Sequence, residues 1–186
     1  MPRPPPAAPR RPNPDVPRSL PDAIGFLLGV WLALALLLPF AARGAQAPNP
    51  DPELAALEQA LHAGANRVRA DHHRIALVRR ADLDAVARAH GADMAVRGYL
   101  AHESPEGHNP VDRLQRGGIG GFSLAGENAG QTNRTDPVRE ILEGWQLSPT
   151  HRTNLLAPAF NTTGVGVARA ADGTLYFVQV YVTFPR

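Results

Sequence analysis

The last apolar segment of the chain limits its fold more than any other feature. Residues 174–184, TLYFVQVYVTF, are apolar at most successive positions rather than at every second one. A strand with apolar side chains on both faces must be covered on both sides, so it belongs inside a sheet. An Ala-Asp-Gly turn at 171–173 separates it from NTTGVGVARA, residues 161–170, and Asp-Gly is a typical hairpin signal. We therefore expect two antiparallel strands, of which the last lies centrally in the sheet.

Helical patterns supply the layers that would cover this sheet. The first helix carries an apolar stripe at Leu54, Leu57, Leu61 and Val68. The third and fourth each begin with a capping residue followed by proline, Asp136-Pro137 and Ser148-Pro149, and we expect the Ser148 hydroxyl to cap its helix. Helices are expected at 54–71, 81–100, 136–145 and 148–158, and a short strand at 121–130. This order predicts an α+β fold, a three-layer α-β-α sandwich around a small central antiparallel sheet.

The N-terminal region is predicted to be a targeting signal rather than part of this fold. Residues 1–47 are rich in proline and arginine and contain an uncharged apolar segment at 23–40. Ala45-Gln46-Ala47 has the small-x-small form of a signal peptidase site. Two alternatives stay open here: a signal peptide cleaved after Ala47, or an uncleaved signal anchor that spans the membrane. Both predict export across the cytoplasmic membrane, to the extracellular or periplasmic side.

Charge and composition exclude several classes of function. Residues 48–53 form a polar linker, and residues 54–186 form the predicted domain. Residues 48–186 carry 14 Arg against 15 Asp and Glu, so the domain lacks the basic excess on which nucleic-acid binding depends. The chain contains no cysteine, which excludes disulfides, a thiol nucleophile and cysteine-ligated metal.

Three polar residues are candidates for a common site. His102, Glu127 and His151 each lie at the edge of a predicted element, beside Gly or Pro, where loops can present them to one cleft. His90 lies on an apolar helix face and is expected to be a core or boundary histidine. The pair His72-His73 is expected to be solvated. No serine lies in a Gly-x-Ser-x-Gly context, so a nucleophile elbow is not indicated.

The ordered motifs resemble those of the CAP superfamily, which comprises cysteine-rich secretory proteins, antigen 5 and pathogenesis-related class 1 proteins. The resemblance covers residues 54–186 and is greatest to the cysteine-free bacterial secreted branch. It rests on Asn66-x-x-Arg69, Gly126-Glu127-Asn128, Trp145-x-x-Ser148-x-x-His151-Arg152-x-Asn154-Leu155-Leu156-x-Pro158 and Gly164-Val165-Gly166. It implies an SCP-like α-β-α sandwich with a large open cavity.

The resemblance also implies a set of site residues. Animal and plant members hold two His and two Glu in the cavity, and His102, Glu127 and His151 match three of these four. Ser148 stands where the second Glu would be, so the set is incomplete and Ser148 becomes a cavity residue. Two His and one carboxylate could still hold Zn²⁺ with an open fourth position, although no cofactor is required. Asn66, Arg69, Asn128 and Trp145 are interpreted as structural.

Three functions are compatible with these residues. The first is a non-catalytic domain that binds a small apolar ligand, such as a lipid or sterol, or a cell-envelope component. The second is a protein-interaction module of the envelope or spore coat. The third is a metal-assisted hydrolase that uses His102, Glu127 and His151 around a metal-bound water. The missing second carboxylate weakens the catalytic alternative, because it removes a candidate general base. No nucleic-acid partner is expected.

Overall fold

The computed structural model describes residues 51–185. The predicted signal or anchor segment at 23–40, the cleavage site at Ala47 and residues 48–50 of the linker lie outside the described residues. Within residues 51–185, no helix combines the length and the apolar character that a membrane span requires.

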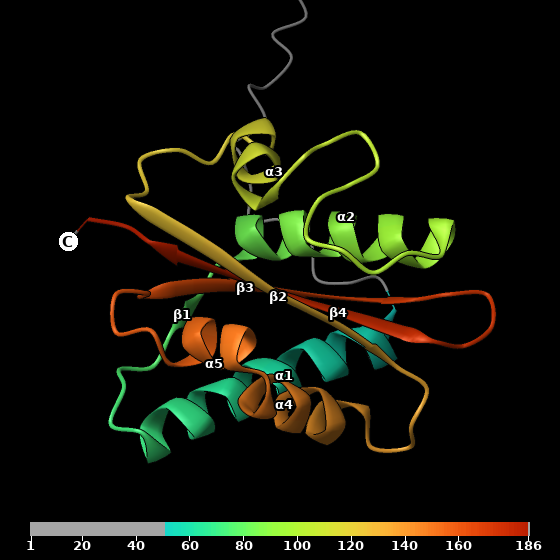
Figure 1. Ribbon diagram of the computed structural model, residues 1–186, viewed down its shortest axis with the longest axis horizontal. Coiled ribbons are helices and arrows are strands. Elements are labelled where there is room, and N and C mark those ends of the chain that lie inside the picture. Colours follow the sequence, from blue (N-terminus) through green and yellow to red (C-terminus); the bar gives the residue numbers. More distant parts are fainter. Residues whose placement is uncertain (1–50, 186) are drawn as a thin grey trace, which may run out of the picture. The chain divides into compact units, whose positions relative to one another are not determined.

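A four-stranded sheet lies between two layers of helices (Figure 1). Its order is β1-β3-β4-β2; β3 pairs antiparallel with β4, β4 antiparallel with β2, and β1 parallel with β3. One face packs on α2 and α3, and the other on α1, α4 and α5. This arrangement confirms the predicted α-β-α sandwich. The elements are α1 Pro52–Asp71, β1 Val78–Arg79, α2 Ala81–Arg97, α3 Pro110–Arg116, β2 Leu124–Thr132, α4 Pro137–Leu147, α5 Pro149–Leu156, β3 Thr162–Arg169 and β4 Leu175–Thr183.

Strand β4 is an interior strand, as its sequence predicts. Its residues Leu175–Val182 are all buried, and only Thr183 reaches partial exposure. Alternate side chains enter different cores: Val178 and Val180 pack with α2, whereas Leu175 and Phe177 pack with α1 and α4. The hairpin turn to β3 lies at the predicted place, and Gly173 adopts a φ of 88° there, which glycine tolerates without strain.

Three local predictions differ from the structure. The buried face of α1 includes Glu58, whereas Leu57 and Val68 are only partly buried, so the core face is rotated from the expected stripe. The two-residue strand β1 was not expected, because two residues are too few to show an alternating pattern. The glycine-bracketed strand begins at Leu124 and extends to Thr132, since β4 offers nine paired positions along this length.

Helix α2 packs directly against the backbone of β3. Gly164 and Gly166 face the helix, and a β-carbon at either position would collide with backbone atoms of α2, at Leu83 and at Ala87–Arg88 respectively. The intervening Val165 and Val167 point to the opposite core, because successive strand residues alternate between faces. The Gly-Val-Gly motif therefore fixes how closely the α2 layer approaches the sheet.

The outer edge of β3 is covered mainly by side chains rather than by a long strand. Strand β1 pairs only with Thr162 and Thr163, so the outer edge of β3 has no strand partner beyond them. There, the Val165 amide donates to Asp84 Oδ1 at 2.8 Å and the Val167 amide donates to Glu58 Oε1 at 3.3 Å. These carboxylates satisfy backbone groups that would otherwise be buried without partners.

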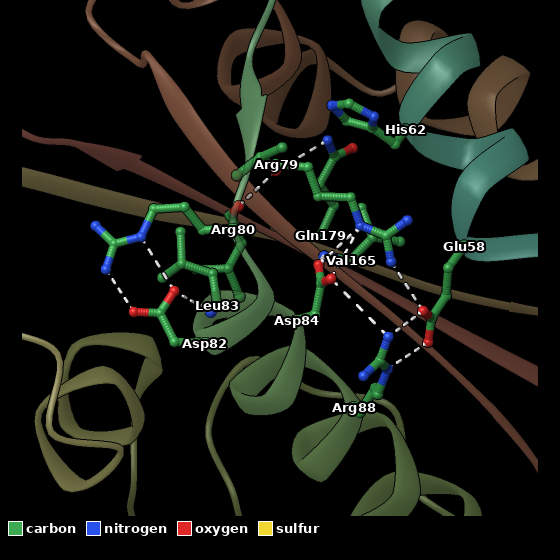
Figure 2. A network of polar contacts seen from close by, with 12 residues as sticks. Glu58, His62, Arg79, Arg80, Asp82, Leu83, Asp84, Arg88, Val165 and Gln179 are labelled. Atoms are coloured by element: carbon green, nitrogen blue, oxygen red, sulfur yellow. Dashed lines mark hydrogen bonds and ion pairs between the residues drawn. The ribbon is translucent and has the colours of Figure 1, made fainter. Parts of the chain in front are cut away.

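Two arginines neutralise these carboxylates (Figure 2). Arg88 pairs with Glu58 through Nε at 2.8 Å and Nη2 at 2.6 Å. Arg79 bridges both acids, with Nη2 2.8 Å from Glu58 Oε2 and Nε 3.0 Å from Asp84 Oδ1. Because the Glu58 and Asp84 side chains are only 1% and 8% exposed, an unpaired charge at either position would be costly.

Removing one charge from this network should destabilise the domain. We expect Glu58→Gln to lower the free energy of unfolding by about 3 kcal/mol, near the lower end for a broken buried pair, because Arg79 and Arg88 reach solvent. Glu53→Gln is the matched control on the same helix. Glu53 pairs with Arg169 at 2.7 Å but is 70% exposed, and its loss should cost less than about 1 kcal/mol. Urea denaturation measures both, and equal effects would contradict the assignment of Glu58.

Candidate functional site

The structure brings His102, Glu127 and His151 together from three separate elements. His102 lies in the loop after α2, Glu127 on the edge strand β2 and His151 in the first turn of α5. His102 Nδ1 lies 2.9 Å from Glu127 Oε1, and the rings of His102 and His151 meet edge to face with centroids 6.1 Å apart. The Glu127 side chain is 1% exposed and the His102 side chain 48% exposed. A buried carboxylate thus stands behind a histidine that faces solvent.

The alternation of strand β2 sends neighbouring residues to opposite sides. Glu127 turns toward α2 and α3, where Arg113 also lies, while Asn128 turns toward α5. Asn128 Nδ2 donates to the backbone oxygen of His151 at 2.9 Å and to the Tyr181 hydroxyl at 3.1 Å. These two bonds fix the first turn of α5 on the sheet, so Asn128 positions His151.

Side chains from α4 and α5 also cover the free edge of β2. Asn154 Nδ2 donates to the Glu127 backbone oxygen at 2.9 Å, and Trp145 Nε1 donates to the Ala129 backbone oxygen at 3.3 Å. The Trp145 ring lies 6.5 Å from that of His151, so it also forms part of the surroundings of the site.

The other two motif residues lie in a different part of the fold and hold loops in place. Arg69 is fully buried and donates to the backbone oxygens of Leu155, Ala157 and Phe160, which follow His151 along the chain. Asn66 pairs with the backbone N–H and C=O of Leu77. These contacts agree with a structural interpretation of both residues.

Ser148 does not cap α5 with its side chain, contrary to the prediction from the Ser-Pro pattern. Ser148 is both the C-cap residue of α4 and the N-cap residue of α5. Its hydroxyl makes no hydrogen bond to the described residues. Instead, the backbone of Ser148 connects the two helices: its N–H donates to the Gly144 oxygen of α4, and its C=O accepts from the Arg152 N–H of α5. The proline at N1 sets the start of the helix without help from the hydroxyl.

The sequence did not identify Arg113 as a residue of the site, nor did it show that His90 lies near Glu127. Arg113 Nη2 lies 2.6 Å from Glu127 Oε2, and its Nη1 donates to the backbone oxygens of His102 at 2.9 Å and His108 at 2.7 Å. His90 is a buried core histidine, as expected, yet its Nε2 is also 3.8 Å from Glu127 Oε1. The Asn109-Pro110 helix start, with its capping box, was the available signal for the helix that carries Arg113.

The histidines of the site differ in charge for physical reasons. The hydrogen bond that His102 makes to the Glu127 carboxylate raises the pKa of His102 above 6.5, although partial burial opposes it. Burial lowers the pKa of His151, and the neighbouring His102 lowers it further. Burial likewise lowers the pKa of His90. The raised pKa of His102 favours its protonated form beside Glu127, and the lowered pKa values of His151 and His90 favour their neutral forms.

As arranged, these side chains do not fit the three-ligand zinc site that the resemblance allowed. Glu127 Oε1 already accepts from His102 and Oε2 from Arg113. A divalent cation that displaced the His102 contact would meet the guanidinium charge of Arg113 across the same carboxylate. Within residues 51–185, no group of three or more His, Asp or Glu side chains is placed so that it could hold a metal ion.

Comparison with known proteins identifies the family. Residues 63–181 match the model of CAP, the cysteine-rich secretory protein family. Since this match covers more than half of the chain, the protein belongs to that family. Its fold resembles that of an extracellular protein with an SCP domain from Bacillus anthracis, with a TM-score of 0.62 at 30% identity, covering 74% of this chain and 45% of that one. It also shares its fold with an outer surface protein of Borrelia burgdorferi, with a TM-score of 0.64 at 17% identity, covering 70% and 94%.

Two Bacillus subtilis proteins are similar in sequence. The uncharacterised protein YkwD is 37% identical over 86 residues, which are 46% of this chain and 32% of that protein. The uncharacterised membrane protein YlbC is 34% identical over 97 residues, which are 52% of this chain and 26% of that protein. The matches thus span about a third or less of these relatives' length.

The pairing of His102 with Glu127 should be visible in its titration. In an NMR pH titration, we expect His102 to titrate above 6.5 and His151 below it, and Glu127→Gln should lower the pKa of His102. Because the folded-state pKa of His102 is raised, the pair stabilises the fold fully below about pH 6.5 and loses this contribution as pH rises through the folded-state value. A His102 pKa that Glu127→Gln leaves unchanged would contradict the ion pair.

Proposed function

We propose that this protein is an exported CAP domain that binds a ligand at His102 and His151 without catalysing a reaction. The observation that most supports this proposal concerns the buried Glu127 carboxylate: one of its oxygens is hydrogen-bonded to His102 and the other to Arg113. Such a carboxylate orients the histidine, and because both of its oxygens already form hydrogen bonds with paired donors, it is itself a weaker general base.

The catalytic alternative lacks its necessary parts in this geometry. A metal-assisted hydrolase needs a metal held by several ligands and an open position for water, and the donors here are already committed to one another. The Ser148 hydroxyl makes no hydrogen bond to His102 or His151, so the structure offers it no base that would activate it as a nucleophile. This leaves binding as the function that the site favours.

The accessible face of the site supports recognition of a ligand with a polar group. His102 uses Nδ1 for Glu127, so Nε2 remains available for a hydrogen bond with a ligand. His151 adds a side chain for which the neutral form is favoured, and the buried Trp145 ring lies next to it. We propose a lipid- or sterol-like molecule or another component of the cell envelope. The extracellular and surface relatives support export of the chain, with residues 23–40 as its signal peptide or membrane anchor.

A protein-interaction role is a second candidate, and a separate observation favours it. Ile75 and Val78 are 66% and 64% exposed, and Val78 belongs to the outermost strand of the sheet. Apolar side chains at a sheet edge favour association with another chain. This surface involves neither His102 nor His151, so the two roles can be separated by mutation.

Native mass spectrometry of the full-length protein, purified from its own envelope, tests the proposal. We expect the wild-type protein to carry a co-purifying small molecule, and His102→Ala and His151→Ala each to lose most of it. His73→Ala is the control, because His73 is exposed and lies outside the site. A ligand retained equally by both site variants would contradict the proposed site. A bound protein that Val78→Ser removes would support the second candidate instead.

A further inference from the structure

We propose that Arg113 is the resident cation of this site, and that its guanidinium occupies the electrostatic position that a divalent metal would otherwise take beside Glu127. The site would then bind its ligand without a metal. This inference rests on the site defined above but not on the identity of the ligand, so a failed ligand search would leave it intact.

Arg113 contacts the site at two points through one rigid group. Its Nη2 donates to Glu127 Oε2 at 2.6 Å, and its Nη1 donates to the backbone oxygen of His102 at 2.9 Å. The ring of the same His102 reaches the other oxygen of Glu127. Arg113 therefore holds both the carboxylate and the backbone of the histidine that the carboxylate orients. A planar guanidinium suits this double role, because its donors have fixed directions.

The ion pair between Arg113 and Glu127 is buried, so each charge needs the other to compensate it. The side chains of Arg113 and Glu127 are 11% and 1% exposed. Arg113 Nε is buried and donates no hydrogen bond to the described residues. An unsatisfied buried donor costs free energy, which the pairing with Glu127 offsets. Without Arg113, Glu127 would be a buried carboxylate balanced only by His102, and a metal cation could supply the missing charge.

The short helix α3 holds Arg113 in this position. Asn109 and Asp112 form a capping box at its start, and Pro110 occupies its first turn. Leu114, next to Arg113, is fully buried in the core shared with α2. At the end of the helix, a β-carbon on Gly117 would lie 2.9 Å from Val86 of α2, so the two helices are in close contact. The guanidinium thus projects from a capped and anchored helix rather than from a mobile loop.

Zinc calorimetry on the full-length protein tests this inference. Zinc chloride is titrated into wild type, His102→Ala, Arg113→Gln, Arg113→Lys and the double variant Arg113→Gln/His102→Ala. We expect the wild-type heats to equal those of His102→Ala. Arg113→Gln should bind zinc at least about tenfold more tightly, since the repulsion is gone. The double variant should lose this gain, and Arg113→Lys should resemble wild type because it keeps the charge.

A control variant and a second measurement show whether any change in zinc binding is specific to Arg113. Arg116→Gln removes an arginine from the same helix that forms no ion pair with the described residues, and it should leave zinc binding unchanged. Zinc should raise the melting temperature of Arg113→Gln but not of the double variant. The inference is wrong if wild type takes up zinc through His102, or if Arg113→Gln gains no affinity. Should Arg113→Gln not fold, zinc uptake through His102 by wild type or Arg113→Lys would still overturn it.

Discussion

The carboxylates of Glu58 and Asp84 at the open edge of β3 are the interaction on which the rest of the structure depends. Strand β1 covers two residues of that edge, and beyond it the buried amides of Val165 and Val167 donate to these acids. One acid comes from α1 and the other from α2, so the same contacts join both helical layers to the sheet. Because α2 leads into the loop that carries His102, this network also anchors the helix from which that loop starts.

The opposite edge of the sheet is also closed by side chains, and the candidate site lies beside it. Side chains of Asn154 and Trp145 cover the free carbonyls of β2, and Asn128 holds the first turn of α5 against the strand. With α5 fixed there, His151 stands beside His102 at the rim. The side chains that close this edge thus differ from the site residues, but they hold the strand and the helix that carry Glu127 and His151.

Prediction from sequence was accurate where one local pattern decided the outcome. The continuous apolar run identified β4 as an interior strand, and the Asp-Pro and Ser-Pro starts placed α4 and α5. It was less accurate where a contact with another element decided. The acid on the core face of α1 makes sense only beside Arg88 and the β3 edge. Ser148 was expected to cap α5 with its hydroxyl because Ser-Pro is a common helix start, but only its backbone joins the two helices.

By itself, the sequence determined the layers of this protein, because periodicity and helix starts are local properties, and the family resemblance pointed to three polar residues of the candidate site. Only the tertiary structure decided the chemistry of those residues. Arg113 lies 14 positions from Glu127 on another element, and no local pattern links them. Their contact at 2.6 Å engages one oxygen of the buried carboxylate, and both the proposed binding role and the proposed resident cation rest on it. Electrostatic interactions of this kind depend on distance in space and on burial, and both are set only when the chain has folded.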